Sequence, residues 1–520
     1  MSHFALNIEI VITVLIIISI VSLIARKFNL PSTLVLILTG LFLSFFDMDL
    51  GIHLTPELLL TLFLPALLFE GAMNIDFSEF RRNLKSISVF SIIGVLTSVF
   101  SAGFLVHYIL KIPWQISFLL ATMIVPTDPI AVLNIFKKLG VSKKLTTIIE
   151  GESLFNDGTS LVLFKLFLAG VVTGSFSIKS SLVGFARLFF GGIALGFLLG
   201  YLLSKILKRV DDSMIQLSLT TVLAYSSFLI AEKLGLSGVV CSVTSGLVIG
   251  NYATRFISPS SKISIASFWE FIGSILNSIV FLLIGIEISI DNLITHINPI
   301  VLAFVSIIAA RAVSIYVLSF LINKIDDSKL ITGIDEFIPL KWQHVIIWGG
   351  LHGGLSMVLA LSLEQSIPNR DLLLSSVFGV VFISLVLQGT TMAKLLNFLN
   401  LSKTKTDPEI EYEKATADLI RTNASEDELE ELWKKKLISK KIYKKFKSRI
   451  KRLKKKSEKN FDRIYDKFPE LEKTQKKEVE KSLLISQKSS LIDAHKSGII
   501  SEKTKNRIVT EIDRKIVELR

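Results

Sequence analysis

The chain contains 520 residues, half of them hydrophobic, and carries a net charge of +13. Apolar runs of membrane-spanning length recur from Asn7 to about Leu399, which indicates an all-α polytopic membrane protein and excludes an ordinary soluble domain. The single cysteine, Cys241, excludes an intramolecular disulfide framework and a cysteine-rich metal site.

The apolar runs predict about thirteen transmembrane helices. The first run lacks a basic leader and an Ala-x-Ala pattern, so we expect a retained span rather than a signal peptide. With the N-terminus outside, the inner loops hold seventeen basic residues and the outer loops four, which places the C-terminal tail in the cytoplasm. The predicted spans are residues 7–25, 30–46, 56–73, 86–110, 113–136, 145–174, 181–204, 213–232, 236–252, 264–289, 297–322, 342–363 and 372–398.

The fifth and twelfth predicted spans contain residues that interrupt a helix. The fifth carries prolines at Pro126 and Pro129, which remove backbone donors and free carbonyls at membrane depth. The twelfth carries Gly349-Gly350-Leu351-His352-Gly353-Gly354, which is equally unfit for a regular helix. The two positions correspond if spans 1–6 and 8–13 are repeats of opposite orientation, a pattern that points to a secondary transporter's binding site. Two unrelated kinks are the alternative.

The sixth predicted span carries a polar run, Gly151-Glu152-Ser153-Leu154-Phe155-Asn156-Asp157-Gly158. At helical spacing, Glu152 lies one turn from Asn156 and Ser153 one turn from Asp157, so the four side chains form one stripe. Counting about 1.5 Å per residue from Leu145 places Asp157 roughly 18 Å deep, near the middle of the hydrocarbon core. Acids at that depth are costly unless they are paired, hydrated or ion-bound, so the run favours cation handling over a polar pair that only joins two helices.

Further ionisable residues occur at membrane depth in other spans. Asp128, Arg311 and His352 fall near the midplane and Glu70 lies nearer the inner end, which suggests a shared hydrated cluster with compensating charges. Each alone has a structural interpretation, such as an arginine that fixes a carboxylate. Lys165 falls near the outer end of its span, where we expect its side chain to snorkel to the surface.

The final part of the chain differs in composition. Residues 402–520 contain 33 Lys and Arg against 22 Asp and Glu, and so carry +11 of the net +13. We therefore divide the chain into a transmembrane domain, 1–401, and a basic cytoplasmic tail of several amphipathic helices, 402–520. A solvated helix face is the ordinary interpretation of its lysine-rich runs. Attraction to anionic membrane lipids comes second, and we predict no nucleic-acid partner.

Several of these motifs together resemble one family. The run Gly151–Gly158, the Pro126-Thr127-Asp128-Pro129 motif, Phe69-Glu70 and the Gly-Leu-His-Gly-Gly run are similar to the monovalent cation–proton antiporter family, in its sodium/proton exchanger branch. The resemblance covers about residues 1–400. It implies a six-helix core domain with two crossed broken helices, a dimerisation domain that forms a homodimer, a bacterial inner (plasma) membrane location and a role in pH homeostasis.

The resemblance also implies a cation site. Asp157 would be the residue that alternately binds a proton and a cation, and Asn156 its structural partner. Ser153 and the main chain or hydroxyl of Thr127 would be further Na⁺ ligands.

Other residues receive supporting roles from the same resemblance. Glu70 would line the ion route, Asp128 would lie at the helix crossing, and Glu152 and Arg311 would form an ion pair between the sixth and eleventh helices. Most members have Gly-Leu-Arg-Gly where this chain has His352, so a permanent charge becomes an imidazole that can lose its proton near neutral pH. His352 could therefore modulate pH dependence, or only fill space at the helix break.

We predict a transporter, not an enzyme, that exchanges Na⁺, or Li⁺ or K⁺, for H⁺ with electroneutral one-for-one stoichiometry by alternating access. It needs no cofactor beyond the transported ions, and no Walker-type run indicates an ATP site. The alternatives are a proton-independent cation channel and a K⁺-selective efflux antiporter. An intramembrane hydrolase is weaker, because Phe155 replaces the last glycine of a Gly-x-Ser-x-Gly motif.

Overall fold

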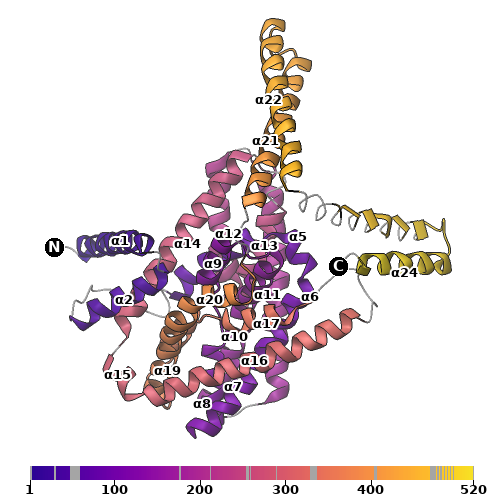
Figure 1. The fold of residues 1–520 in the computed structure, drawn as a ribbon. Helices are drawn as coiled ribbons and strands as arrows, with labels where there is room; N and C mark the ends of the chain where they lie inside the picture. The colour runs from indigo at the N-terminus through magenta and orange to yellow at the C-terminus, as the bar shows by residue number, and fades with distance from the viewer. Residues whose placement is uncertain are drawn as a thin grey trace. The chain divides into compact units, whose positions relative to one another are not determined.

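The computed structural model consists of helices and connecting loops, with no strand in the residues that it describes (Figure 1). It divides into two compact units, Met1–Ser402 and Lys403–Arg520. The described residues are 3–28, 31–46, 59–174, 177–210, 212–252, 257, 259–288, 290–327, 337–402, 407–468, 497–518 and single residues or short stretches between 476 and 495.

One to three consecutive helical elements lie in each range that the sequence predicts as a span. In chain order the elements of the first unit are α1 (His3–Lys27), α2 (Ser32–Phe45), η1 (Leu59–Phe63), α4 (Leu64–Asn74), α5 (Phe77–Arg82), α6 (Leu84–Ser88), η2 (Val89–Gly94), α7 (Val95–Leu110), α8 (Trp114–Ile124), α9 (Ile130–Leu139), α10 (Lys143–Thr173), α11 (Ile178–Leu207), α12 (Ser213–Lys233), α13 (Gly238–Asn251), α14 (Pro259–Glu287), α15 (Ile290–Thr295), α16 (Ile297–Asp327), α17 (Leu340–Trp348), α18 (Gly354–Leu361), α19 (Arg370–Ile383), η4 (Ser384–Gln388) and α20 (Gly389–Phe398).

Seven of the described helical segments are long enough and apolar enough to cross a membrane. They are Leu84–Leu110, Lys143–Thr173, Lys179–Leu207, Ser213–Lys233, Ser261–Glu287, Ile297–Lys324 and Arg370–Phe398. Local signals set their ends. The Ser142 hydroxyl accepts a hydrogen bond from Leu145 N at the start of α10, and Gly174 ends that helix with a φ of +66°.

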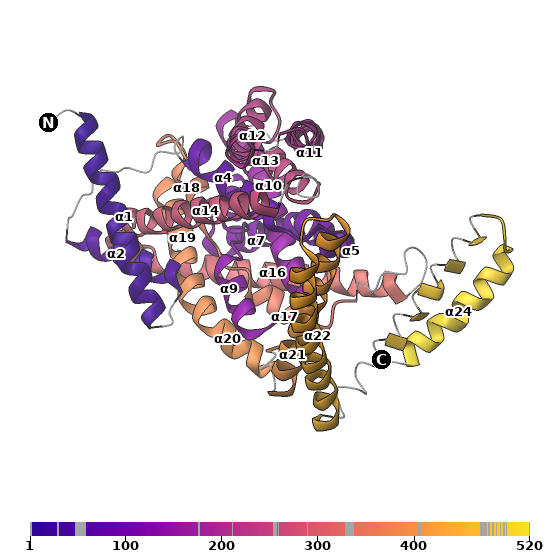
Figure 2. The same ribbon diagram turned by 90° about the horizontal axis from the view of Figure 1, so that it is seen from above.

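The helices of the first unit form two groups that pack mainly within themselves. The first helix group contains α1, α2, α4 and α11–α14, and Figures 1 and 2 show α11, α12 and α13 side by side. The second helix group contains η2, α6–α10 and α16–α20. The two groups meet where α10 packs on α11 and α13 and where α14 packs on α18.

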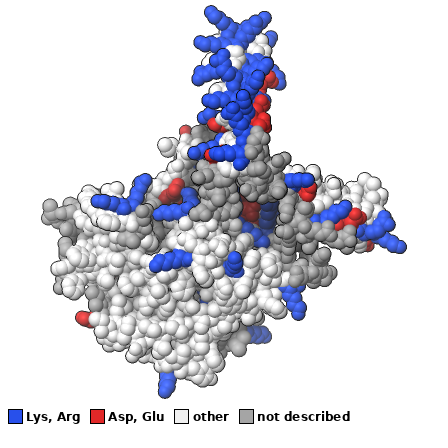
Figure 3. Space-filling view, viewed as in Figure 1, with Lys and Arg blue, Asp and Glu red and all other residues white. Residues whose placement is uncertain are grey.

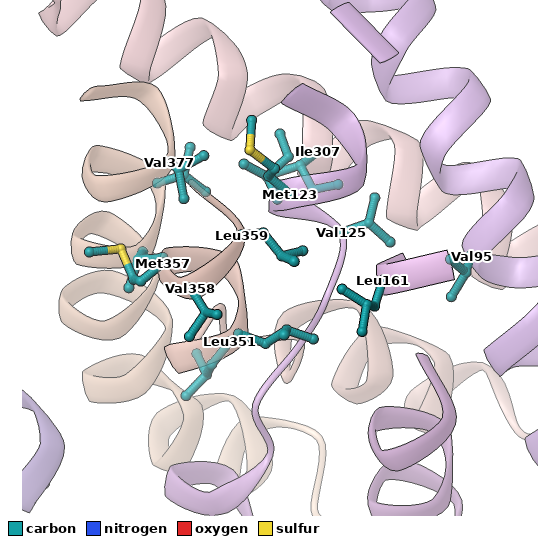
Figure 4. Close-up of a cluster of buried hydrophobic side chains, with 14 of the residues drawn as sticks. Val95, Met123, Val125, Leu161, Ile307, Leu351, Met357, Val358, Leu359 and Val377 are labelled. Carbon is teal, nitrogen blue, oxygen red and sulfur yellow. The ribbon is translucent and has the colours of Figure 1, made fainter. Parts of the chain in front are cut away.

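Two helices of the second group are interrupted where the sequence predicts it. Val125–Pro129 separates α8 from α9, and Gly349–Gly353 separates α17 from α18. Figure 4 shows buried apolar side chains of α8, α16, α18 and α19 around these interruptions, among them Met123, Ile307 and Leu359. This packing fixes two irregular segments inside the membrane part of the chain.

The second unit contains a helical hairpin and a further helix. The acidic helix α21 (Asp407–Lys434) packs on the lysine-rich helix α22 (Lys440–Lys467), and α24 (Glu502–Glu518) follows. Lys454 donates a hydrogen bond of 2.6 Å to Glu426 and so holds the pKa of that carboxyl below its usual range. In the view of Figure 3, Lys and Arg cover this hairpin, whereas the visible surface of the first unit carries few charges.

Candidate cation site

A cavity of about 430 Å³ lies between the two helix groups. Its walls come from α2, α4 and α14 of the first group and from α9, α10, α18 and the α8–α9 interruption of the second. Five residues singled out from the sequence line it: Glu70, Thr127, Asp128, Ser153 and Asp157. Asn156, Glu152, Arg311 and His352 do not line the cavity, and their contacts lie behind its wall.

Three oxygen-bearing residues from two elements converge at the deep end. The Ser153 hydroxyl donates a hydrogen bond to the Thr127 carbonyl, which joins α10 to the α8–α9 interruption. That carbonyl has no helical partner because Pro126 and Pro129 interrupt the helix. Among the described residues, none forms a hydrogen bond or ion pair with the Asp157 carboxylate. A free carboxylate beside a hydroxyl and a carbonyl suits a hard monovalent cation or a proton.

Asn156 holds this arrangement from behind. Its amide nitrogen donates to the Thr127 hydroxyl at 2.7 Å and to Glu152 Oε1 at 3.3 Å, while its amide oxygen accepts from Thr127 N at 3.4 Å. The side chain is fully buried. A buried polar group is stable only when it is hydrogen-bonded, and Asn156 meets that condition while positioning Thr127.

The charge of Glu152 is neutralised by Arg311 of α16. Two parallel hydrogen bonds, of 3.1 Å and 2.9 Å, join the guanidinium to the carboxylate, and the two side chains are 9% and 3% exposed. Arg311 also donates to the Ile346 carbonyl of α17 at 3.2 Å and 3.1 Å. The pair therefore joins α10, α16 and α17.

The two interruptions contact each other beside Asp128. Asp128 N donates to the Leu351 carbonyl at 2.6 Å, and Asp128 Oδ1 accepts from Ile130 N at 2.9 Å. A Cβ at Gly353 would lie 2.7 Å from Asp128 Oδ2, so only glycine allows this approach. The two broken helices thus meet through main-chain contacts at the cavity wall.

His352 also bridges the two interruptions. Its Nδ1 donates to the Pro126 carbonyl at 3.2 Å, and its backbone N–H donates to the Ser384 hydroxyl at 3.2 Å. The ring is buried, its Nε2 has no partner, and no ion pair with Asp128 occurs among the residues that the structure describes. The observed contacts make His352 a link between the two breaks.

At the shallow end, carboxylates from three helices face the same space. Glu70 of α4 accepts a hydrogen bond of 2.6 Å from Asn74, and Glu150 of α10 and Glu270 of α14 line the same cavity. Asn74 and Glu270 are exposed, so this end is the cavity mouth. The sequence places Glu150 at a shallow, more easily hydrated depth of the sixth predicted span, and it gave no signal for Glu270, which falls near a span end.

The C-terminal half of α10, which follows Asp157, packs against the first helix group. A Cβ at Gly158 would lie 2.7 Å from Val240 of α13, so the helices touch there. Lys165, which the sequence predicts to reach the surface, is 38% exposed and has a partner that the sequence did not indicate. It forms hydrogen bonds of 2.9 Å and 2.7 Å with Glu232 of α12, and Glu232 also accepts from Gly238 N at 3.0 Å.

Comparison with known proteins matches the chain to one family. The family described as "Sodium/hydrogen exchanger, transmembrane" matches residues 11–398, which include every element around the cavity. The chain belongs to this family. It is therefore a transporter-family protein and an integral membrane protein, and not an enzyme.

Individual sodium/proton exchangers are similar to this chain over different parts of its length. The low-affinity Na⁺/H⁺ antiporter NhaS1 of Synechocystis sp. is 39% identical over 376 residues, 72% of this chain and 70% of the relative. The Na⁺/H⁺ antiporter NhaG of Bacillus atrophaeus is 32% identical over 95% of both chains, so that similarity extends into the tail.

The exchanger's fold also matches a solved structure. The sodium proton antiporter MjNhaP1 from Methanocaldococcus jannaschii, determined at pH 8, superposes with a TM-score of 0.65 at 21% identity, covering 78% of this chain and all of the other. The match shows a shared fold.

Proposed function

We propose that this exchanger moves Na⁺ in one direction and H⁺ in the other, one for one, with Asp157 as the shared ligand. The names of the relatives NhaS1 and NhaG support the coupled ions. The observation that carries the proposal is the unpartnered Asp157 carboxylate at the deep end of the cavity, beside the oxygens of Ser153 and Thr127. A carboxylate that either ion can neutralise explains exchange, because a bare charge crosses the membrane interior at high cost.

The surrounding network supports electroneutral exchange. Glu152 is neutralised by Arg311, and Asn156 beside Asp157 is an uncharged amide whose nitrogen and oxygen both form hydrogen bonds. One titrating acid at the deep end therefore fits the exchange of one proton for one Na⁺. Asp128 is held by backbone contacts at the crossing of the helices, and Glu70 lines the route to the mouth.

We further propose that the two helix groups move past each other. The first would be a dimerisation domain of a homodimer and the second a six-helix core domain, in a fold of thirteen spans and two inverted repeats. The cavity mouth lies toward the start of α10, where Lys143 and Lys144 follow the basic run of α9, so the positive-inside rule makes the mouth cytoplasmic. With the N-terminus outside and the tail in the cytoplasm, this conformation faces inward.

The test uses purified protein in liposomes with the membrane potential clamped. An imposed gradient of Na⁺, Li⁺ or K⁺ should drive proton movement of opposite sign, and the rate should not depend on the imposed potential. Cation flux without proton movement would make the protein a channel. Proton coupling to K⁺ alone would make it a K⁺ efflux antiporter and remove Na⁺ from the mechanism.

A further inference from the structure

Ser356, in the first turn of α18, has a hydroxyl with no hydrogen-bond partner. The residue is fully buried, and it lines the same cavity as Asp157, Ser153 and Thr127. It was not singled out in the sequence. An unpaired buried hydroxyl is uncommon in a folded protein, because losing its bonds to water costs free energy.

The helix break explains why this hydroxyl is unpaired. Serines inside helices usually donate to a carbonyl three or four residues earlier, as Ser362 does to Leu359 at 2.7 Å. For Ser356 those residues are Gly353 and His352, which belong to the interruption and do not continue the helix. The Ser356 hydroxyl therefore has no partner in its own helix, and the residue lies in the cavity wall.

Ser356 comes from a different element than the other candidate ligands that line the cavity. Thr127 belongs to the first interrupted helix and Asp157 and Ser153 to α10, whereas Ser356 belongs to the second interrupted helix. Its turn is closely packed, since a Cβ at the neighbouring Gly354 would lie 3.0 Å from Val280 of α14. An oxygen on a fixed turn discriminates between ions of different size better than one on a flexible loop.

We propose that Ser356 is a further ligand of the transported cation and helps to set the preference among Na⁺, Li⁺ and K⁺. This inference rests on the proposed function and adds to it a contact from the second interrupted helix. The ion, or a water molecule that stays on it, supplies the partner that the hydroxyl lacks. Both interruptions then contact the same ion.

The test compares Ser356→Ala with Ser376→Ala. Ser376 of α19 is a matched control because its hydroxyl is also buried and unpaired, but it does not line the cavity. Ser356→Ala should raise the apparent KM for Na⁺ roughly fivefold, as losing about 1 kcal/mol of binding implies, and should change the ratio of Na⁺ to Li⁺ affinity. Ser376→Ala should leave both unchanged, and Ser356→Thr should restore Na⁺ affinity.

A second measurement separates binding from folding and does not need exchange. In choline buffer the Ser356→Ala protein should unfold at the wild-type temperature or higher, because no hydrogen bond is lost. The increase in Tm that Na⁺ produces should shrink, since stabilisation follows binding. Wild-type KM values and wild-type Na⁺ stabilisation in Ser356→Ala would overturn this inference while leaving Na⁺/H⁺ exchange intact. Absence of Na⁺-driven proton movement in the wild type would instead overturn the proposed function.

Discussion

Each half of α10 carries an ion pair, and the two pairs are built differently. In the N-terminal half, which is the inner half in the proposed orientation, Glu152 meets Arg311 inside the second helix group, with both side chains almost fully buried. In the C-terminal half, which is the outer half in that orientation, Lys165 meets Glu232 of the first group, with side chains 38% and 33% exposed. The inner half also faces the cavity, whereas the outer half packs on α13 through Gly158.

This difference suggests separate roles for the two pairs: one keeps the geometry of the cation site, and the other allows the two helix groups to move. A buried pair within one group keeps its geometry when the groups shift, so it can hold the site during transport. A half-exposed pair between groups can separate at low cost, because water hydrates the released charges. We therefore expect the inner pair to determine stability and the outer pair to determine which side of the membrane the site faces.

The largest effect should follow from breaking the inner pair. Arg311→Ala leaves Glu152 buried and uncompensated, and losing one partner of such a pair costs about 3–5 kcal/mol. Thermal unfolding in detergent should show this loss. Adding Glu152→Ala should give a smaller loss than the sum of the two single variants, and additive losses would contradict the comparison.

Arg82→Ala is the matched control for that experiment. Arg82 pairs with Glu79 at 3.0 Å three residues earlier, but its side chain is 68% exposed. An exposed pair contributes about 0–1 kcal/mol, so its loss should leave the unfolding temperature nearly unchanged.

The outer pair should affect transport more than stability. Lys165→Gln should change the free energy of unfolding by less than about 1 kcal/mol, because water already reaches both charges. It should alter the exchange rate, since the closed outer side loses one of its contacts. Exchanging the two charges, with Lys165→Glu and Glu232→Lys together, should move the rate back toward wild type. An unchanged rate in Lys165→Gln would show that the pair does not contribute to closure.

A smaller effect is expected at His352. A glutamine can donate to the Pro126 carbonyl as the imidazole does. The exchange rate of His352→Gln should therefore stay within about twofold of wild type, a smaller change than the loss of a typical hydrogen bond would cause, and its pH profile should be unchanged. His352→Ala removes that bond and should be slower. If His352→Gln and His352→Arg moved the pH profile in opposite directions, the imidazole would act as a counter-charge of Asp128.

The smallest effect on the exchange step itself should follow from removing the second unit. Every residue of the cation site precedes Ser402, so a chain truncated there should retain exchange in liposomes. We expect a shifted pH or cation dependence, because the tail carries most of the net charge. Complete loss of exchange in a stably inserted truncated protein would contradict this expectation.

The sequence predicts the features that depend on local chemistry. Two prolines three residues apart and a run of four glycines within six residues both disfavour a continuous helix, so both breaks could be placed from Pro126, Pro129 and the Gly349–Gly354 run. The partner of Lys165 could not be predicted from the sequence, because Glu232 is 67 residues away and reaches it only through packing of α10 on the α12–α13 turn. The role of Ser356 could not be predicted either, since its missing hydrogen bond depends on the geometry of the break.

The most direct test of the central claim measures protons released when Na⁺ binds to purified protein in weakly buffered solution. If proton and Na⁺ compete for Asp157, adding Na⁺ at a pH where the site is protonated should release about one proton per ion bound. Asp157→Asn should release none and should not exchange, while remaining folded in the membrane. Release of protons on Na⁺ binding in Asp157→Asn, or Na⁺ binding to the wild type without proton release, would contradict the account.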